Sequence, residues 1–216
     1  ISAGAVMHYL SETQHQKINH ITSINRIPQD DYIWMDGFTI KNLEIFQSLG
    51  REGKSLIDVI DKTISPMGGR LLKRWVALPS KNIKTIQDRH LTVKYFIDDE
   101  SCLNSLQEKI NEIGDLERLV SKAATAKINP REVIYLKNSL IAIEPIKKLT
   151  NQSNHKSLKE LSKSLDPCKK LIQIIDKTLN EDAPVNILKG DSISSDFSKE
   201  LKNLREMAFS NKEFLD

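Results

Sequence analysis

Apolar positions recur at steps of three and four along most of this chain, which is the spacing of an amphipathic helix. The runs with this spacing cover residues 66–76, 82–97, 115–126, 130–143, 171–179 and 197–208. Residues that favour helix starts stand at the beginning of three of them. Pro66 and Pro130 fit a first helical turn, and Asn82 can cap the helix that follows it. The sequence therefore predicts a mainly α, multi-helical fold.

One segment near the N-terminus departs from this spacing. Residues 32–35 and 38–46 are rich in aromatic and branched side chains, and they flank an Asp36-Gly37 step. Asp-Gly readily adopts the positive φ of a tight turn, so this segment predicts a small β-hairpin. A second short extended piece is predicted within residues 185–193, around a Lys189-Gly190-Asp191 turn.

The helical spacing also selects an expected core. Its members are Leu43, Ile45, Leu56, Leu71, Leu72, Trp75, Leu116, Leu119, Leu136 and Leu140. Pro145 should end or kink the helix that begins at Pro130, because proline removes a backbone donor and clashes with the preceding turn.

Composition limits the class of protein. With 39% hydrophobic and 28% charged residues, wholesale disorder is not expected. No apolar stretch approaches the ~18 residues of a membrane span, and the N-terminal residues do not resemble a signal peptide. Cys102 and Cys168 are the two cysteines, and neither lies in a CxxC. We therefore expect reduced thiols in a cytoplasmic protein with no membrane partner.

Several blocks of the sequence resemble one family, in the same order. DGFTIKNLEI (residues 36–45) is followed by SLIDVIDKTISPMGGRLLKRWVALP (55–79), by residues 113–140 and by residues 180–206. Together they are similar to the core domain of MutS, the family of DNA mismatch-recognition ATPases, and residues 3–14 resemble the helix leaving its connector domain. The matching positions are expected to be scaffold, and they are Asp36, Thr39, Asn42, Leu43, Glu44, Gly68, Asp115, Leu116, Glu117 and Arg118.

The resemblance implies a domain order. Residues 1–31 would enter from the connector, residues 32–195 would form the helical core, and residues 196–216 would begin a lever helix that leads to a DNA clamp. The parent protein would act on mismatched DNA as a homodimer, with ATP and magnesium bound outside this chain. The chain would contact its own connector, clamp and ATPase domains and transmit nucleotide state between them. An alternative is a free-standing helical module for protein–protein interaction.

Catalytic, nucleotide and metal sites are not indicated. Gly50, Gly53, Lys54 and Ser55 lie in GREGKS, which is two residues shorter than a phosphate-binding loop, so we interpret it as an ordinary loop. Histidines such as His15 and His20 have no cysteine or paired carboxylate at ligand spacing. His90 lies on the apolar side of its expected helix, where a hydrogen-bonded core histidine is the commoner role. We therefore assign no catalytic residue, no metal ligand and no cofactor to the chain.

The best candidate for nucleic-acid contact is a group of three basic residues. Arg70, Lys73 and Arg74 share one side of the helix expected after Pro66. A weak contact with the DNA backbone is one interpretation, and a solvated helix face is the other. The net charge of +3 is small for a dedicated nucleic-acid-binding domain, which favours the solvated face.

Overall fold

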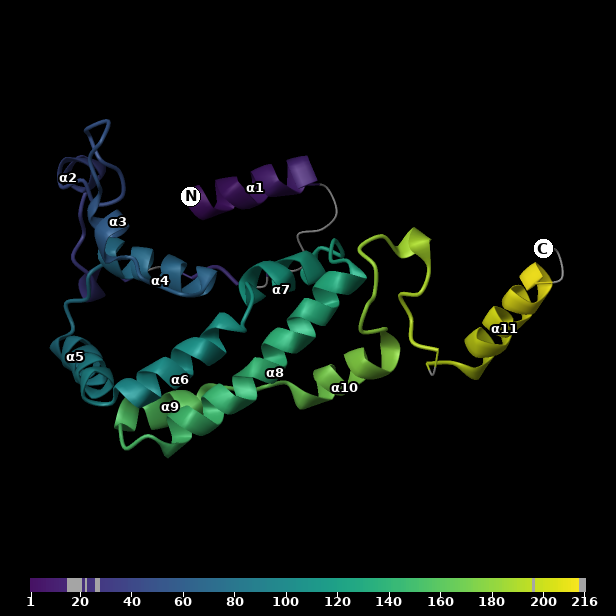
Figure 1. Ribbon diagram of the computed structural model, residues 1–216. Helices are drawn as coiled ribbons and strands as arrows, with labels where there is room; N and C mark the ends of the chain where they lie inside the picture. The colour runs from purple at the N-terminus through teal and green to yellow at the C-terminus, as the bar shows by residue number, and fades with distance from the viewer. Residues whose placement is uncertain (15–20, 22, 26–27, 196, 214–216) are drawn as a thin grey trace. The chain divides into compact units, whose positions relative to one another are not determined.

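The computed structural model describes residues 1–14, 21, 23–25, 28–195 and 197–213. Helices dominate these residues (Figure 1), and the predicted mainly α fold is confirmed. The described residues contain two isolated β-bridges, Tyr32 with Ser80 and Leu179 with Ile193, and no strand. The chain divides into two compact units, Ile1–Leu103 with Val120–Ala126 (unit 1) and Asn104–Leu119 with Lys127–Asp216 (unit 2).

The helices follow one another with short connections. In the first half of the chain they are α1 (Ser2–Gln14), η1 (Gln29–Asp31), α2 (Gly37–Asn42), α3 (Leu56–Ile60), α4 (Pro66–Ala77), α5 (Ile83–Asp98) and α6 (Glu100–Asn111). In the second half they are α7 (Leu116–Ala124), α8 (Pro130–Gln152), α9 (Lys156–Ser164), α10 (Lys169–Thr178), η2 (Ile187–Lys189) and α11 (Lys199–Glu213).

The predicted β-hairpin in residues 32–46 is wrong. Asp36 caps helix α2 there, and its Oδ1 accepts the backbone N–H of Thr39 at 2.7 Å. The pKa of Asp36 is lowered because the backbone N–H of Thr39 and then its side chain donate to the carboxylate. An Asp-Gly pair suits the N-cap and first residue of a helix as well as a hairpin turn, and a carboxylate that satisfies a free helical N–H favours the helix.

Local chemistry at the other helix starts is as expected. Pro66 and Pro130 occupy the first turns of α4 and α8. The side chain of Asn82 accepts the backbone N–H of Thr85 at 3.1 Å and caps α5. At α8, Asn129 accepts the N–H of Glu132 at 3.0 Å. These three starts were predictable because a cap depends on residues within one turn of each other.

Helix α8 does not end at Pro145. It continues to Gln152. Ile143 and Ile146, on either side of the proline, are both buried. Packing of this face on both sides of Pro145 offsets the hydrogen bond that proline cannot donate.

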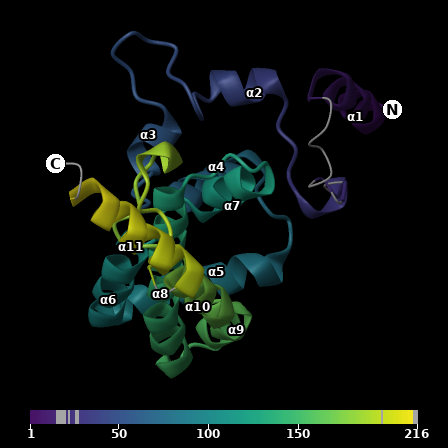
Figure 2. The same cartoon turned by 90° about the vertical axis from the view of Figure 1, so that its right-hand side faces the viewer.

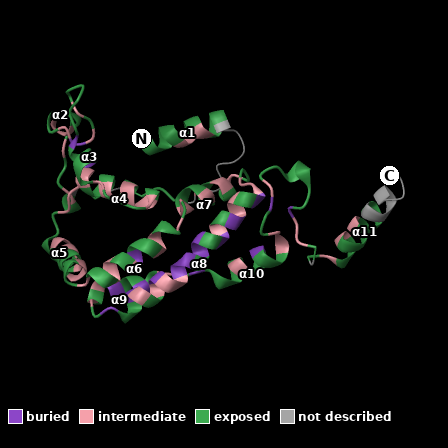
Figure 3. Ribbon diagram, viewed as in Figure 1, coloured by how far each residue is buried: buried purple, intermediate pink, exposed green. Residues whose placement is uncertain are grey.

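Unit 2 is organised around α8. Helices α9 and α10 pack along it in both views (Figure 1; Figure 2), and buried residues run along its length (Figure 3). Ile134 of α8 packs with Ile175 of α10 and with Ala183 in one buried cluster. Beside this cluster, Lys137 is 7% exposed, and its Nζ lies 2.8 Å from Oδ1 of Asp176 on α10.

The expected core is right at two positions and wrong at four. Ile45 and Leu140 are buried, whereas Leu43, Leu56, Leu71 and Trp75 are exposed. The remaining residues of that set are half-buried: Leu72, Leu116, Leu119 and Leu136. Helical spacing identifies which side chains share a face, but it does not say whether another element covers that face.

Trp75 of α4 has a specific neighbour in unit 1. The Arg89 guanidinium of α5 lies over its ring, with Cζ 3.7 Å from the ring centroid, so a cation–π contact joins the two helices. At the other end of α5, the Tyr95 hydroxyl donates to Asp99 at 3.2 Å. Burial, with Cys102 and Asp99 beside the ring, raises the pKa of Tyr95 to about 12.

The C-terminal part of unit 2 contains a turn and helix α11. Gly190 and Asp191 have φ values of 79° and 55°, so the predicted turn is present. The predicted extended piece is replaced by the 3-10 helix η2 and a single bridge at Ile193. Phe197, which the apolar spacing of residues 197–208 predicts to anchor the last helix, lies beside Asp176 and Lys177 in a shallow cavity but remains largely exposed. The apolar spacing thins after Ala208, which predicts loose packing of Lys212, Glu213 and Phe214, and these side chains lie outside the described part of the chain.

Candidate functional site

One member of the predicted basic group on α4, Lys73, lies near carboxylates of its own unit. Arg70, Lys73 and Arg74 are all exposed on α4. The pKa of Asp58 is lowered, mainly by hydrogen bonds from Ser55 and further by the charge of Lys73. Asp58 therefore lies near Lys73, and a phosphate would have to compete with this carboxylate for the Lys73 ammonium group.

Asp61 lies in the same surroundings. Thr63 donates its hydroxyl to Asp61 at 2.6 Å and its backbone N–H at 3.0 Å. These hydrogen bonds lower the pKa of Asp61, and the nearby charge of Lys73 adds to the effect. Two carboxylates therefore lie near Lys73, and a DNA contact by Arg70, Lys73 and Arg74 stays a prediction.

The DGFTIKNLEI block connects α2 to α3 by hydrogen bonds. Glu44 has a left-handed φ of 48°, and its carboxylate accepts the N–H of Leu49 at 2.7 Å. The carbonyl oxygens of Glu44 and Ile45 accept the N–H groups of Leu56 at 2.9 Å and Ile57 at 3.0 Å. Of the other matching residues, Asn42 ends α2 and is exposed, as is Leu43. The hydrogen bonds described for this block lie within the fold.

Two further matching segments lie at helix starts. The N–H of Gly68 donates to the Ser65 hydroxyl at 3.1 Å, and a Cβ at Gly68 would lie 3.1 Å from the same oxygen, so the close approach leaves little room for a side chain. Asp115 precedes α7, and its carboxylate accepts the N–H of Arg118 at 3.2 Å. Leu116 is half-buried and Glu117 exposed in the first turn of that helix. A scaffold role for these residues stays a prediction.

The described residues considered for metal or nucleotide binding lie on an exposed helix face, in a turn or in a helix cap. No group of three or more His, Cys, Asp or Glu side chains in the described part of the chain could hold a metal ion. His90 is exposed, so its expected core position is wrong, and His15 and His20 lie outside the described residues. In GREGKS, Gly53 and Gly50 form a turn, and the Ser55 hydroxyl donates to Asp58 at 2.7 Å in the cap of α3.

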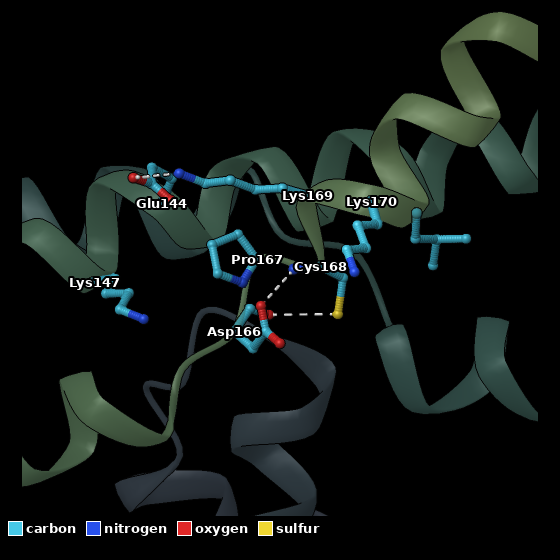
Figure 4. A pocket seen from close by; sticks show the side chains of 8 residues that line it. Glu144, Lys147, Asp166, Pro167, Cys168, Lys169 and Lys170 are labelled. Atoms are coloured by element: carbon cyan, nitrogen blue, oxygen red, sulfur yellow. Dashed lines mark hydrogen bonds and ion pairs between the residues drawn. The ribbon is translucent and has the colours of Figure 1, made fainter.

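A basic groove in unit 2 was missed from the sequence. It has a volume of about 680 Å³ and lies between α8 and the beginning of α10 (Figure 4). Its lining consists of Glu144, Lys147, Asp166, Pro167, Cys168, Lys169, Lys170 and Leu171. The lysines come from two Lys-Lys pairs about twenty residues apart, which only the packing of α10 against α8 brings together. These two Lys-Lys pairs were the feature of the sequence that could have indicated the groove.

Comparison with known proteins identifies the family. The family described as MutS domain III matches residues 38–212. The chain belongs to this family. It is 52% identical over its full length to the DNA mismatch repair protein MutS of Christiangramia forsetii and 51% identical to that of Flavobacterium johnsoniae. It is 43% identical over 215 residues to the MutS of Parabacteroides distasonis.

This MutS domain III chain spans 25% of the length of each of those relatives. Its helical architecture agrees with the resemblance noted in the sequence blocks. Across the part of the chain that the structure describes, no helix combines the length and the apolar character needed to span a membrane.

Proposed function

We propose that this chain is the core and lever scaffold of a MutS-type mismatch-recognition protein. In this role it transmits nucleotide state between an ATPase domain and a DNA clamp. The observation that carries the proposal is the match of MutS domain III to residues 38–212, together with 51% identity over the whole chain to a DNA mismatch repair protein. The same observation favours this role over a free-standing interaction module.

The packing of unit 2 supports a mechanical role. Helix α8 has 23 residues, which corresponds to about 35 Å at 1.5 Å per residue. Helices α9 and α10 fix it through buried apolar contacts, the Lys137–Asp176 pair and a hydrogen bond of 2.8 Å from Lys147 Nζ to the Leu165 carbonyl. A helix held along its length moves as a rigid body, and rigid bodies with discrete arrangements can couple distant sites.

The proposal assigns chemistry to other parts of the longer protein. Binding of ATP and magnesium, recognition of mismatched DNA and formation of a homodimer would reside outside this chain, in a cytoplasmic protein. The chain alone should therefore not hydrolyse ATP. Phosphate release from ATP by the purified chain, abolished by Lys54→Ala, would revive the nucleotide interpretation of GREGKS and contradict this assignment.

A chimera tests the transmission role. The matching quarter of the Flavobacterium johnsoniae MutS is replaced by this chain, with and without Leu204→Pro in α11. We expect the unmodified chimera to release mismatched DNA on ATP addition. Leu204→Pro should slow that release strongly and leave nucleotide affinity nearly unchanged, because proline breaks the helix at a cost of ~3 kcal/mol or more.

The matched control is Leu204→Ala, which shortens the same exposed side chain but keeps the helix. The control should release DNA at the rate of the unmodified chimera. If Leu204→Pro released DNA as fast as Leu204→Ala, α11 would not transmit nucleotide state and the proposed role would be wrong.

A further inference from the structure

One groove of unit 2 carries more lysine charge than its carboxylates balance (Figure 4). Glu144 on α8 is shared between two lysines, with Lys169 at 3.3 Å and Lys148 at 4.0 Å. Lys147 Nζ donates one hydrogen bond to a neutral partner, the Leu165 carbonyl oxygen, at 2.8 Å. A single carboxylate therefore compensates two ammonium groups, and the charge of a third is left uncompensated by its hydrogen bond.

Asp166 is the second carboxylate of the groove, and four lysines against two carboxylates still leave an excess of positive charge. One oxygen of the Asp166 carboxylate accepts the backbone N–H of Cys168 at 2.9 Å, within the turn that precedes α10. Among the described residues, no carboxylate lies within ion-pair distance of Lys170. Lys169 and Lys170 also occupy the first turn of α10, where no acidic residue is present. Positive charge at this end of a helix opposes the helix dipole, so the two lysines are placed at some cost to stability.

The excess extends beyond the groove. Residues 144–170 contain seven lysines and three acidic residues, an excess of four, although the whole chain has a net charge of only +3. Lys156, Lys159 and Lys163 are exposed on α9, and their spacing places them on one side of that helix. This segment therefore carries a local positive excess, as residues 62–94 also do with eight basic residues and one acidic residue.

We propose that the lysine groove, lined by Lys147, Lys169 and Lys170 and flanked by Lys148, which pairs with its Glu144, binds the phosphodiester backbone of nucleic acid without reading its sequence. Lysine is a compact point charge suited to phosphate contact. The groove lining contains no arginine for bidentate contact with a base edge and no aromatic ring on which a base could stack. A nucleic-acid ligand would therefore contact this groove through its phosphate backbone.

The same composition argues against an acidic protein as the partner. Protein–protein interfaces are depleted in lysine and depend on aromatic and arginine anchors, which the groove lining lacks. The inference is independent of the proposed lever role, and it concerns a different surface from Arg70, Lys73 and Arg74 on α4. Among the described residues, Lys170 has no carboxylate within ion-pair distance.

Binding of a fluorescent 40-base-pair DNA duplex to the 216-residue chain tests the proposal. We expect a Kd of about 10⁻⁴–10⁻⁶ M near physiological salt, tightening as salt is lowered. The triple variant Lys148→Gln/Lys169→Gln/Lys170→Gln should bind at least about tenfold more weakly at low salt. The slope of log K against log salt should become shallower by about 2–3, because each lost phosphate contact removes about 0.9 from it.

The control is Lys177→Gln/Lys189→Gln/Lys202→Gln, which removes the same charge from three exposed lysines of unit 2. It should keep the affinity within about twofold and the salt slope unchanged. Far-UV circular dichroism checks that both triple variants fold.

Four outcomes would overturn the proposal. The chain could fail to bind the duplex at low salt, or both triple variants could weaken equally, which would reduce the effect to net charge. Displacement of the duplex by polyglutamate more effectively than by unlabelled duplex at equal charge would indicate an acidic polypeptide ligand. Displacement by millimolar orthophosphate at constant ionic strength would indicate a small-anion site.

Discussion

The ion pair between Lys137 and Asp176 should stabilise unit 2 in a strongly asymmetric way. The Lys137 side chain is 9% exposed, whereas that of Asp176 is 52% exposed, and the two atoms lie 2.8 Å apart. Removing Asp176 leaves a buried ammonium without its partner, while removing Lys137 leaves a carboxylate that water can solvate. Asp176→Ala should therefore destabilise the chain more than a volume-conserving Lys137→Met.

The magnitude follows from this exposure. Loss of one partner of a fully buried pair costs 3–5 kcal/mol, but the lysine here can turn toward water on the exposed side of the pair. We expect Asp176→Ala to cost about 1–3 kcal/mol. Lys137→Met should change the free energy of unfolding by less than about 1 kcal/mol, because an apolar side chain of similar volume is often neutral at such sites.

Urea denaturation followed by far-UV circular dichroism measures these differences. The midpoint should shift to lower urea in Asp176→Ala with an unchanged slope, as expected for a change in stability alone. Glu181→Ala, which removes an exposed carboxylate of the same unit, is the charge-matched control and should stay within about 0.5 kcal/mol of the wild type. In the double variant Lys137→Met/Asp176→Ala, most of the cost of Asp176→Ala should disappear. If instead the two single effects simply added, the pair would not be coupled and the reasoning would fail.

Three further predictions concern packing, capping and pH. Ile134→Ala should lower the free energy of unfolding by about 2–5 kcal/mol because Ile134 lies in the buried cluster. Leu72→Ala should lower it by about half as much because Leu72 is only half-buried. Equal losses in urea denaturation would contradict this prediction. Ser55→Ala should lower the free energy of unfolding by about 1–2 kcal/mol, since Ser55 is fully buried and caps α3 in a capping box; an unchanged melting temperature would refute it. The pKa of Asp58 is lowered by its Ser55 hydrogen bonds, so its contribution to stability is present above its ordinary pKa of 3.8 and is lost as pH falls through the lowered value. Asp58→Asn should therefore show a smaller loss of stability on acidification than the wild type, as measured by melting temperature against pH.

The parts of the fold that depend on neighbouring residues were predictable from the sequence. The starts of α4, α5 and α8 follow from Pro66, Asn82 and Pro130 because a helix start depends on side chains within one turn. The error at Asp36 has the same origin, since aspartate followed by glycine satisfies the local geometry of both a turn and a helix cap. The residues that follow Asp36-Gly37 decide which of these two local structures forms.

Features that depend on packing were not predictable. Spacing placed Leu71 and Trp75 on an apolar face of α4, but their exposure depends on what covers that face. Lys137 gave no sign of burial, because its partner Asp176 lies 39 residues further along the chain. The lysine groove was missed for the same reason: Lys147 and Lys169 meet only when α10 packs against α8.

The Arg89–Trp75 contact gives unit 1 an optical signature that unit 2 lacks. The two tryptophans of the chain, Trp34 and Trp75, both belong to unit 1, and unit 2 contains none. Intrinsic tryptophan emission therefore reports the loss of structure in unit 1, with the guanidinium leaving the Trp75 ring as α4 and α5 separate. The backbone signal in the far ultraviolet reports both units. Coincidence or separation of the two denaturation curves would distinguish one cooperative unfolding event from two.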